Sequence, residues 1–316
     1  DYKIGYKSPY RHLDRLTRVY EYMGPAWYQR EIEIPAAWKG KRIFLYFERT
    51  HWLSSVYVGK EEVSKIDYIS IPHNHELTQW LHPGKKELIT FCIDNRYQYD
   101  THKWDHAHSE FTQINWNGVL GEIKLVAVDP VYVDDMQVYP DIKNKSIKVK
   151  MTVRNCTEHT ASGKISFHVS GKDYRLQKEV PVTVTDSITY IEEEMFLGKD
   201  IHLWNEFHPN LYTLDCKLTS SVEGQSYAHE KSTTFGMREV EAGEDHIILN
   251  GEPIHLRGTV ENAVFPKTGY APVDDASWER VLRILKEYGM NHMRFHSWCP
   301  PAAAFRMADK LGVYLE

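Results

Sequence analysis

The last 81 residues of this 316-residue chain alternate between strand and helix patterns, and that order constrains the fold more than any other feature. Residues 253–257 are predicted to form a strand, followed by a long loop over residues 258–273. Residues 291–295 and 313–315 give two further strands, each preceded by an amphipathic helix pattern. Strands that alternate with helices through short connections predict a parallel sheet.

Local signals mark the ends of these elements. Residues 249–253, L-N-G-E-P, are predicted to form a hairpin with Asn-Gly at its tip. The helices begin and end at residues suited to those positions: an N-cap at Asp274 or Asp275, a proline pair at 300–301, and glycines at 289 and 312. The spacing of one helix predicts a buried face of Trp278, Val281, Leu282, Leu285 and Tyr288.

A sheet built in this order is the beginning of a (β/α)₈ barrel, which needs about 250 residues, so roughly a third of one is expected here. Binding and catalytic residues of such barrels lie in the loops at the carboxyl ends of the strands. His296, Ser297 and Trp298 crowd that loop after the strand at 291–295. We therefore predict one wall of an active site, with the other walls beyond the last residue.

The first two thirds of the chain are predicted to be all β. Residues 1–128 hold short alternating strands, such as 27–35, 42–48 and 87–94, at the spacing of a sandwich. Residues 129–235 hold about seven strands over about a hundred residues, which is typical of an immunoglobulin-like sandwich. We therefore expect two β domains before the parallel sheet.

Composition limits the function classes. The net charge of −6 gives no electrostatic reason to expect nucleic acid, and no run of 18 apolar residues predicts a membrane span. Aromatic residues make up 13% of the chain, which favours carbohydrate, although β-rich domains are aromatic for other reasons. Four widely spaced cysteines, Cys92, Cys156, Cys216 and Cys299, form no C-x-x-C pair, so no metal site or cofactor is predicted from them.

Several segments resemble glycoside hydrolase family 2, which contains β-galactosidases, β-glucuronidases and β-mannosidases. The likeness is carried by F-G-M-R at 235–238, L-N-G-E-P-I-H-L-R-G at 249–258, the stretch 288–301 and A-D-K-L-G-V-Y at 308–314, with a looser match at 204–212. The resemblance implies a jelly-roll, sugar-binding-like domain at 1–128, an immunoglobulin-like β-sandwich at 129–235 and the amino-terminal part of a TIM-barrel catalytic domain at 236–316.

The resemblance also implies an activity. Family 2 enzymes hydrolyse with retention through two glutamates on later barrel strands, with carboxyl groups about 5–5.5 Å apart. Neither motif can be placed here, because the one Asn-Glu pair, Asn205-Glu206, falls in the second β domain. We therefore expect the amino-terminal part of a retaining exo-β-glycosidase, β-galactosidase-like, that is inactive alone and lacks catalytic residues of its own. The alternative is a non-catalytic carbohydrate-binding or scaffolding module.

Seven residues are predicted to bind substrate by this resemblance: Arg257, Glu261, Asn262, Arg294, His296, Ser297 and Trp298. Arg257 is placed at the end of the first barrel strand, where structural support is the competing interpretation. Asn262 stands where many β-galactosidases carry a substrate-contacting histidine. Trp298 is expected to be a stacking platform, unless it packs against a neighbouring domain.

Other polar clusters have less specific interpretations. A metal site at His102, Asp105, His106 and His108 is weighed against a simple polar loop, which is favoured. Tyr10, Arg11, His12 and Asp14 are expected at a free surface rather than over the barrel mouth. The resemblance favours a periplasmic or secreted location and leaves a homo-oligomer open. Three barrel strands would also leave an open edge and an exposed apolar face.

Overall fold

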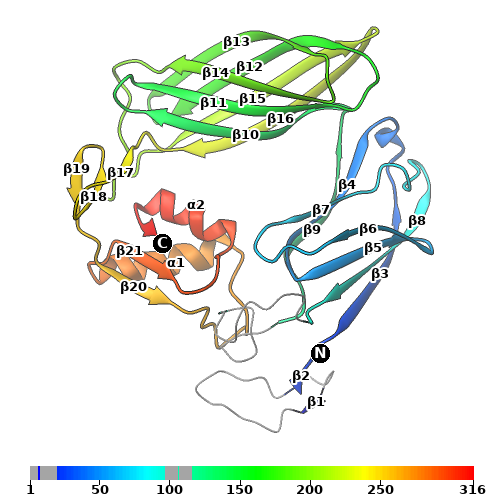
Figure 1. The fold of residues 1–316 in the computed structure, drawn as a ribbon, viewed down its shortest axis with the longest axis horizontal. Helices are drawn as coiled ribbons and strands as arrows, with labels where there is room; N and C mark the ends of the chain where they lie inside the picture. Colours follow the sequence, from blue (N-terminus) through cyan, green and yellow to red (C-terminus); the bar gives the residue numbers. More distant parts are fainter. Residues whose placement is uncertain (1–5, 8–19, 97–105, 107–115) are drawn as a thin grey trace. The chain divides into compact units, whose positions relative to one another are not determined.

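A computed structural model describes residues 6–7, 20–96, 106 and 116–316 (Figure 1). The chain divides into two compact units, one formed mainly by residues 1–127 and 258–308, the other mainly by residues 128–257. Strands dominate both units. Within the described residues, neither helix is long and apolar enough to cross a membrane.

The first unit begins with a β-sandwich. One sheet has the order β3-β8-β5-β6, and the other has the order β7-β4-β9. Their bounds are β3 (Pro25–Glu33), β4 (Arg42–His51), β5 (Leu53–Val58), β6 (Glu61–Ile66), β7 (His73–Glu76), β8 (Lys86–Asp94) and β9 (Gly118–Val128). A short pair, β1 (Tyr6–Lys7) and β2 (Tyr20–Glu21), and a 3₁₀ turn at Ala36–Trp38 complete this part.

Alternation along the strands builds the core of this sandwich. In β4, Ile43, Leu45 and Phe47 are buried, whereas the residues between them are partly exposed. A strand turns successive side chains to opposite faces, so this period of two directs one face inward. Val56 from β5 and Ile93 from β8 meet that face from the opposite sheet.

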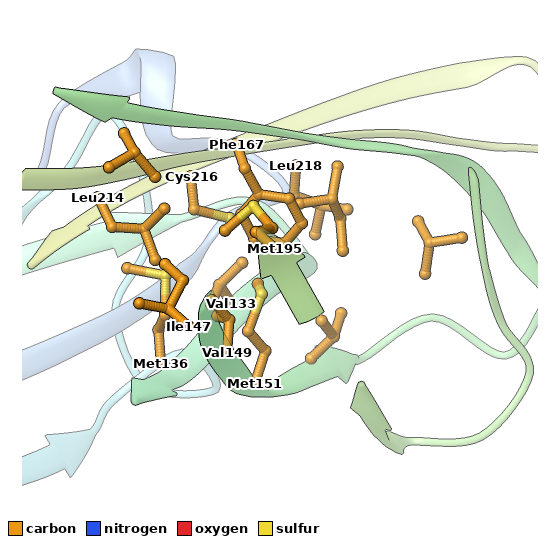
Figure 2. Close-up of a cluster of buried hydrophobic side chains, with 14 of the residues drawn as sticks. Val133, Met136, Ile147, Val149, Met151, Phe167, Met195, Leu214, Cys216 and Leu218 are labelled. Carbon is orange, nitrogen blue, oxygen red and sulfur yellow. The ribbon is translucent and has the colours of Figure 1, made fainter. Parts of the chain in front are cut away.

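The second unit contains another seven-stranded sandwich, whose strands are mostly longer (Figure 1). Its sheets have the orders β10-β11-β14 and β13-β12-β15-β16. The bounds are β10 (Val131–Asp141), β11 (Ser146–Asn155), β12 (Ala161–Gly171), β13 (Tyr174–Val184), β14 (Ile188–Phe196), β15 (Tyr212–Val222) and β16 (Gln225–Phe235). Figure 2 shows Ile147, Val149 and Met151 of β11 packed between the sheets with Phe167 and Cys216.

The chain then forms two small sheets. The strands β17 (Val240–Ala242), β18 (Ile247–Leu249) and β19 (Glu252–Ile254) pair antiparallel. The strands β20 (Gly258–Glu261), β21 (His292–Phe295) and β22 (Tyr314–Leu315) follow in the sheet order β20-β21-β22, and β20 and β21 pair in parallel. Helix α1 (Asp275–Glu287) lies between β20 and β21, and helix α2 (Ala302–Leu311) lies between β21 and β22. The prediction of β-sandwich sheets followed by a small parallel sheet with helices is therefore confirmed.

The predicted first strand at 253–257 is wrong. The Asn250-Gly251 turn is confirmed, with φ of 54° and 86°, and it makes Glu252–Ile254 the return strand of an antiparallel hairpin. The first parallel strand begins instead at Gly258, inside the segment predicted to be a loop. A Cβ at Gly258 would lie 2.4 Å from Nδ1 of His292, so the missing side chain permits the close approach of β21.

The helix signals fare better. Asp274 caps α1, because its Oδ1 accepts the Ser277 N–H at 2.8 Å. Gly289 and Gly312 follow the two helices with φ of 76° and 71°, as predicted for helix ends. Tyr288 was predicted on the buried face of α1 but is 78% exposed, because the helix ends at Glu287 and the chain then turns away.

Candidate functional site

Two loops meet at the carboxyl ends of β20 and β21. The main-chain N–H of His296 donates to the Glu261 carbonyl at 3.0 Å. The indole Nε1–H of Trp298 donates to the same carbonyl at 3.2 Å. Both loops therefore share one acceptor at the end of β20, which is the edge where a parallel sheet collects binding residues.

Each of these loops contains a left-handed residue that is not glycine. Ala263 has φ of 56° and Ser297 has φ of 59°. This conformation is strained for an L residue, and such strain persists only where the surroundings impose it. Its occurrence twice, just beyond two neighbouring strands, points to a backbone shaped for something other than stability.

Glu261 uses its side chain to hold its own loop. Its Oε2 accepts the Ala263 N–H at 2.9 Å, and its Oε1 accepts the Val264 N–H at 3.2 Å. Burial raises the pKa of this carboxyl, and the two amide hydrogen bonds oppose that rise. In this structure Glu261 therefore stabilises the strained turn at Ala263.

Asn262 presents an unsatisfied acceptor. Its Oδ1 is buried and has no hydrogen-bond partner among the described residues. A buried amide oxygen without a partner is costly, and a water molecule or ligand usually accounts for it. Among the predicted site residues, Asn262 is therefore the one whose unsatisfied oxygen best suits a polar ligand.

His296 is held through one ring nitrogen. Its Nδ1 lies 3.2 Å from Nδ1 of His106 and 2.9 Å from Oγ of Ser297. The two imidazole rings meet edge to face, with centroids 4.8 Å apart. In the described part of the chain, no hydrogen bond involves Nε2 of His296, so that nitrogen can serve a ligand as donor or acceptor.

Trp298 does not form the predicted stacking platform. It is 9% exposed, and its ring packs edge-on against Phe295 and Phe265 at centroid distances of 5.3 and 6.4 Å. Its Nε1 is already committed to Glu261. Phe295 comes from β21 and Phe265 from the loop after β20, and together they bury the Trp298 ring. Trp298 therefore stabilises the loop by packing.

Arg294 lies on the exposed face of the parallel sheet. In β21, Met293 and Phe295 are buried, and Arg294 alternates to the other side. Its Nε lies 3.4 Å from Oε1 of Glu316, and Nε2 of His292 lies 3.4 Å from the other oxygen of that carboxylate. The exposed face that was predicted to be apolar therefore also carries the charged side chains of Arg294 and Glu316.

Arg257 is placed differently from the prediction. It precedes β20, whereas the sequence interpretation put it at the end of the first barrel strand. Its Nη2 lies 3.5 Å from Oε1 of Glu206, and its Nη1 donates to the His255 carbonyl at 3.2 Å. The hairpin that ends at Ile254 shifts the strand start past Arg257, and the residue stabilises the second unit through Glu206.

Two contacts at this site were missed by sequence reasoning. Arg49, at the end of β4, is 9% exposed, and its Nη2 donates to the Cys299 carbonyl at 2.6 Å. Burial lowers the pKa of this guanidinium. His106 was noted only as a member of a polar cluster. Neither contact has a local signal, because each joins residues about 200 positions or more apart.

The remaining sequence candidates are not tested by the structure. His102, Asp105 and His108, like Tyr10, Arg11, His12 and Asp14, lie outside the described residues. Within the described ranges, no three His, Cys, Asp or Glu side chains gather as a metal ion would require.

The fold is of a class in which β-sandwich sheets are followed by a small parallel sheet. The loops at the carboxyl edge of that sheet carry polar side chains and left-handed residues. The model of the family "Glycosyl hydrolases family 2" matches residues 131–238. The chain is homologous, over most of its length, to the amino-terminal portion of longer family 2 glycoside hydrolases.

Individual relatives are distant. A β-galactosidase of Thermoanaerobacter pseudethanolicus is 23% identical over 93% of this chain and 39% of its own length. A β-glucuronidase of Paenibacillus borealis is 21% identical over 97% of this chain and 51% of its own length. The chain thus spans about a quarter to a half of the curated relatives it matches.

Solved structures agree in fold. A family 2 member from Bacteroides cellulosilyticus aligns with a TM-score of 0.76 at 20% identity, over 94% of this chain and 40% of that protein. A β-glucuronidase from Bacteroides uniformis aligns with a TM-score of 0.77 at 20% identity, over 93% and 36% respectively.

Proposed function

We propose that the chain is the amino-terminal part of a retaining exo-β-glycosidase. In this proposal residues 1–128 are a jelly-roll domain, residues 129–235 an immunoglobulin-like domain, and residues 236–316 the start of a (β/α)₈ barrel. The homology to family 2 supports this, as does the arrangement of strands and helices after Gly258. In such a barrel the carboxyl edge of β20 and β21 faces the substrate.

The observation that carries the proposal is the set of polar groups at that edge. Asn262 offers an unsatisfied buried oxygen, and His296 offers Nε2 from a ring that is held at Nδ1. An amide and an imidazole donate and accept hydrogen bonds without a fixed charge, which suits the hydroxyl groups of a sugar. Arg294 adds a cation on the exposed face of the same sheet.

The bond-breaking groups are proposed to lie outside these 316 residues. Retention requires a nucleophilic carboxylate and an acid/base carboxyl about 5–5.5 Å apart, on opposite sides of the glycosidic bond. Glu261 does not fit either role, since both of its oxygens accept hydrogen bonds from its own loop. The present residues would therefore bind and orient the sugar.

The substrate is proposed to be a terminal β-galactoside, with a β-glucuronide as the second choice. Relatives with both names match the chain. The full-length protein should release nitrophenol from one of the nitrophenyl β-galactoside, β-glucuronide and β-mannoside substrates, whereas the 316-residue chain alone should release none. Turnover by the isolated chain would overturn the proposed division of roles.

A second candidate function is a non-catalytic carbohydrate-binding module. It is favoured by an aromatic pair on the outer face of the β3-β8-β5-β6 sheet. Trp27 is 60% exposed, and its ring lies 5.5 Å from that of Tyr57. Beside the pair, Gln29 donates to Thr90 at 2.8 Å, so hydrogen-bonding groups flank the rings. Affinity electrophoresis of the chain and of Trp27→Ala in polysaccharide gels tests this function separately from hydrolysis.

A further inference from the structure

We propose that Arg49 of the first sandwich is a positioning residue for the loop between β21 and α2. This inference rests on the proposed function of that loop as a sugar-binding wall. Arg49 donates from Nη2 to the Cys299 carbonyl at 2.6 Å, joining residues 250 positions apart. The contact lies within the first compact unit.

The environment of Arg49 is unusual for an arginine. Its side chain is almost fully buried at the end of β4, and among the described residues it forms no ion pair. A buried guanidinium without a carboxylate partner pays a desolvation cost that a backbone carbonyl only partly offsets. Arginines on protein surfaces avoid this cost. The burial of Arg49 against a loop carbonyl therefore indicates that its hydrogen bond to Cys299 has a function.

The Cys299 carbonyl, which accepts the Arg49 hydrogen bond, lies next to the strained part of the loop. Cys299 follows the left-handed Ser297 and the buried Trp298. The N–H of His296 and the indole of Trp298 both donate to the Glu261 carbonyl. Arg49 binds the carbonyl of the next residue, Cys299, so the strained turn at Ser297 has hydrogen bonds on both sides of it in the sequence.

A second contact from the amino-terminal part of the chain reaches the same loop. Nδ1 of His106 lies 3.2 Å from Nδ1 of His296. One ring must donate and the other accept, which leaves Nε2 of His296 facing away from this contact. Arg49 on β4 and His106, between β8 and β9, thus both contact the loop, and this part of the chain sets the geometry of the sugar site as well as supporting the fold.

The test compares arginines of one strand in the full-length protein. Arg49→Met removes the donor, Arg49→Lys keeps a donor of different shape, and Arg42→Met is the matched control. Arg42 opens β4 and pairs with Glu76 at the other end of the strand. The readouts are kcat and KM for the best nitrophenyl glycoside, the Tm, and hydrogen exchange of the peptide covering 296–299.

Arg49→Met is expected to lower kcat/KM on the order of 10-fold to 100-fold, because a misplacement of about 1 Å can cost that much. Exchange at the His296 amide should accelerate in Arg49→Met, and the Tm should fall no further than in Arg42→Met. Arg49→Lys should recover part of the activity. If Arg49→Met does not fold, Arg49→Lys carries the test through its exchange rate and kcat/KM.

The outcomes separate the two proposals. Wild-type kcat/KM and unchanged exchange in both Arg49 variants would overturn the positioning role and leave the glycosidase proposal intact. Equal losses of kcat/KM in Arg49→Met and Arg42→Met would also overturn the positioning role, since they would indicate a general effect on the sandwich. If the wild-type protein hydrolyses no glycoside, the proposed function fails, whereas faster exchange in Arg49→Met would still establish the anchor.

Discussion

The main-chain N–H of His296 donates to the carbonyl of Glu261 at 3.0 Å, which joins the carboxyl ends of two neighbouring parallel strands. Glu261 ends β20, and His296 directly follows β21. The residues next to this bond, Asn262 and Ser297, are the ones with an unsatisfied oxygen and a left-handed backbone. The bond therefore marks the centre of the candidate site.

Trp298 should stabilise the fold rather than bind sugar. Trp298→Ala removes a ring packed on Phe295 and Phe265 and a hydrogen bond to Glu261. We expect a loss of roughly 3–5 kcal/mol in the free energy of unfolding, measured by urea denaturation with far-UV circular dichroism. The matched control is Trp27→Ala, which removes an exposed ring and should change stability by about 0.5 kcal/mol or less. Equal effects of the two substitutions would contradict the burial of Trp298.

Asn262 should matter for substrate binding and little for stability, the reverse of Trp298. Because its Oδ1 makes no hydrogen bond within the described residues, Asn262→Ala should change the free energy of unfolding by no more than about 0.5 kcal/mol. In the full-length protein the same substitution should lower kcat/KM for the glycoside at least about tenfold, since a buried hydrogen bond to substrate is lost.

The control for Asn262 is another asparagine. Asn155 is 3% exposed, and its Nδ2 donates to the carbonyls of His159 and Val184. Asn155→Ala should destabilise the chain while leaving KM unchanged. A stability loss in Asn262→Ala without a kinetic effect would remove Asn262 from the site.

Gly258 should be required for the parallel sheet. A Cβ there would lie 2.4 Å from Nδ1 of His292 and 2.8 Å from its carbonyl oxygen. Gly258→Ala should therefore cost about 1–3 kcal/mol of unfolding free energy, through the overpacking of β20 against β21. Gly251→Asn is the control, because a Cβ at Gly251 meets nothing within 4 Å and asparagine tolerates its φ of 86°. A neutral Gly258→Ala would mean that β20 and β21 do not approach so closely.

The first sandwich should lose stability in acid because of a buried histidine network. Oγ of Ser54 lies 2.6 Å from Nδ1 of His73 and 2.8 Å from Nε2 of His75. Burial lowers the pKa of His73, and it lowers the pKa of His75 to about 3. An unfolded imidazole binds a proton below about pH 6.5, which the folded one does not accept until far lower pH.

The unfolded state therefore binds more protons between about pH 6.5 and 3, so stability is full above that window and falls as the pH drops through it. Urea midpoints measured from pH 7.5 to 4.5 should decline, and His75→Gln should flatten the decline. A slope that is equal in the wild type and in His75→Gln would contradict the neutral, buried state of His75.

The sequence predicted the elements well where local chemistry decides them. Hydrophobic alternation located several strands of each sandwich, and Asp274, Gly289 and Gly312 marked helix ends because caps act over a few residues. The prediction of the first parallel strand failed at residues 253–257. The Asn250-Gly251 turn makes Glu252–Ile254 a return strand, and the first parallel strand starts at Gly258, which approaches His292, 34 positions further along the chain.

The candidate site was predicted only in part. Asn262, His296 and Ser297 lie at the carboxyl edge of the sheet, as a loop after a parallel strand should. The burial of Trp298 was not readable, because its partner Phe265 comes from the loop after another strand. The contact of Arg49 with Cys299 was not readable either, since nothing near residue 49 indicates a distant backbone carbonyl.

The stereochemistry of hydrolysis by the full-length protein tests the proposed retaining glycosidase. A nitrophenyl β-galactoside or β-glucuronide is incubated with the enzyme, and proton NMR identifies the first-formed sugar anomer. We expect the β anomer, because a covalent intermediate preserves the configuration, and no turnover by the 316-residue chain alone. An α anomer as first product, or no turnover of any β-glycoside by the full-length protein, would contradict this proposal.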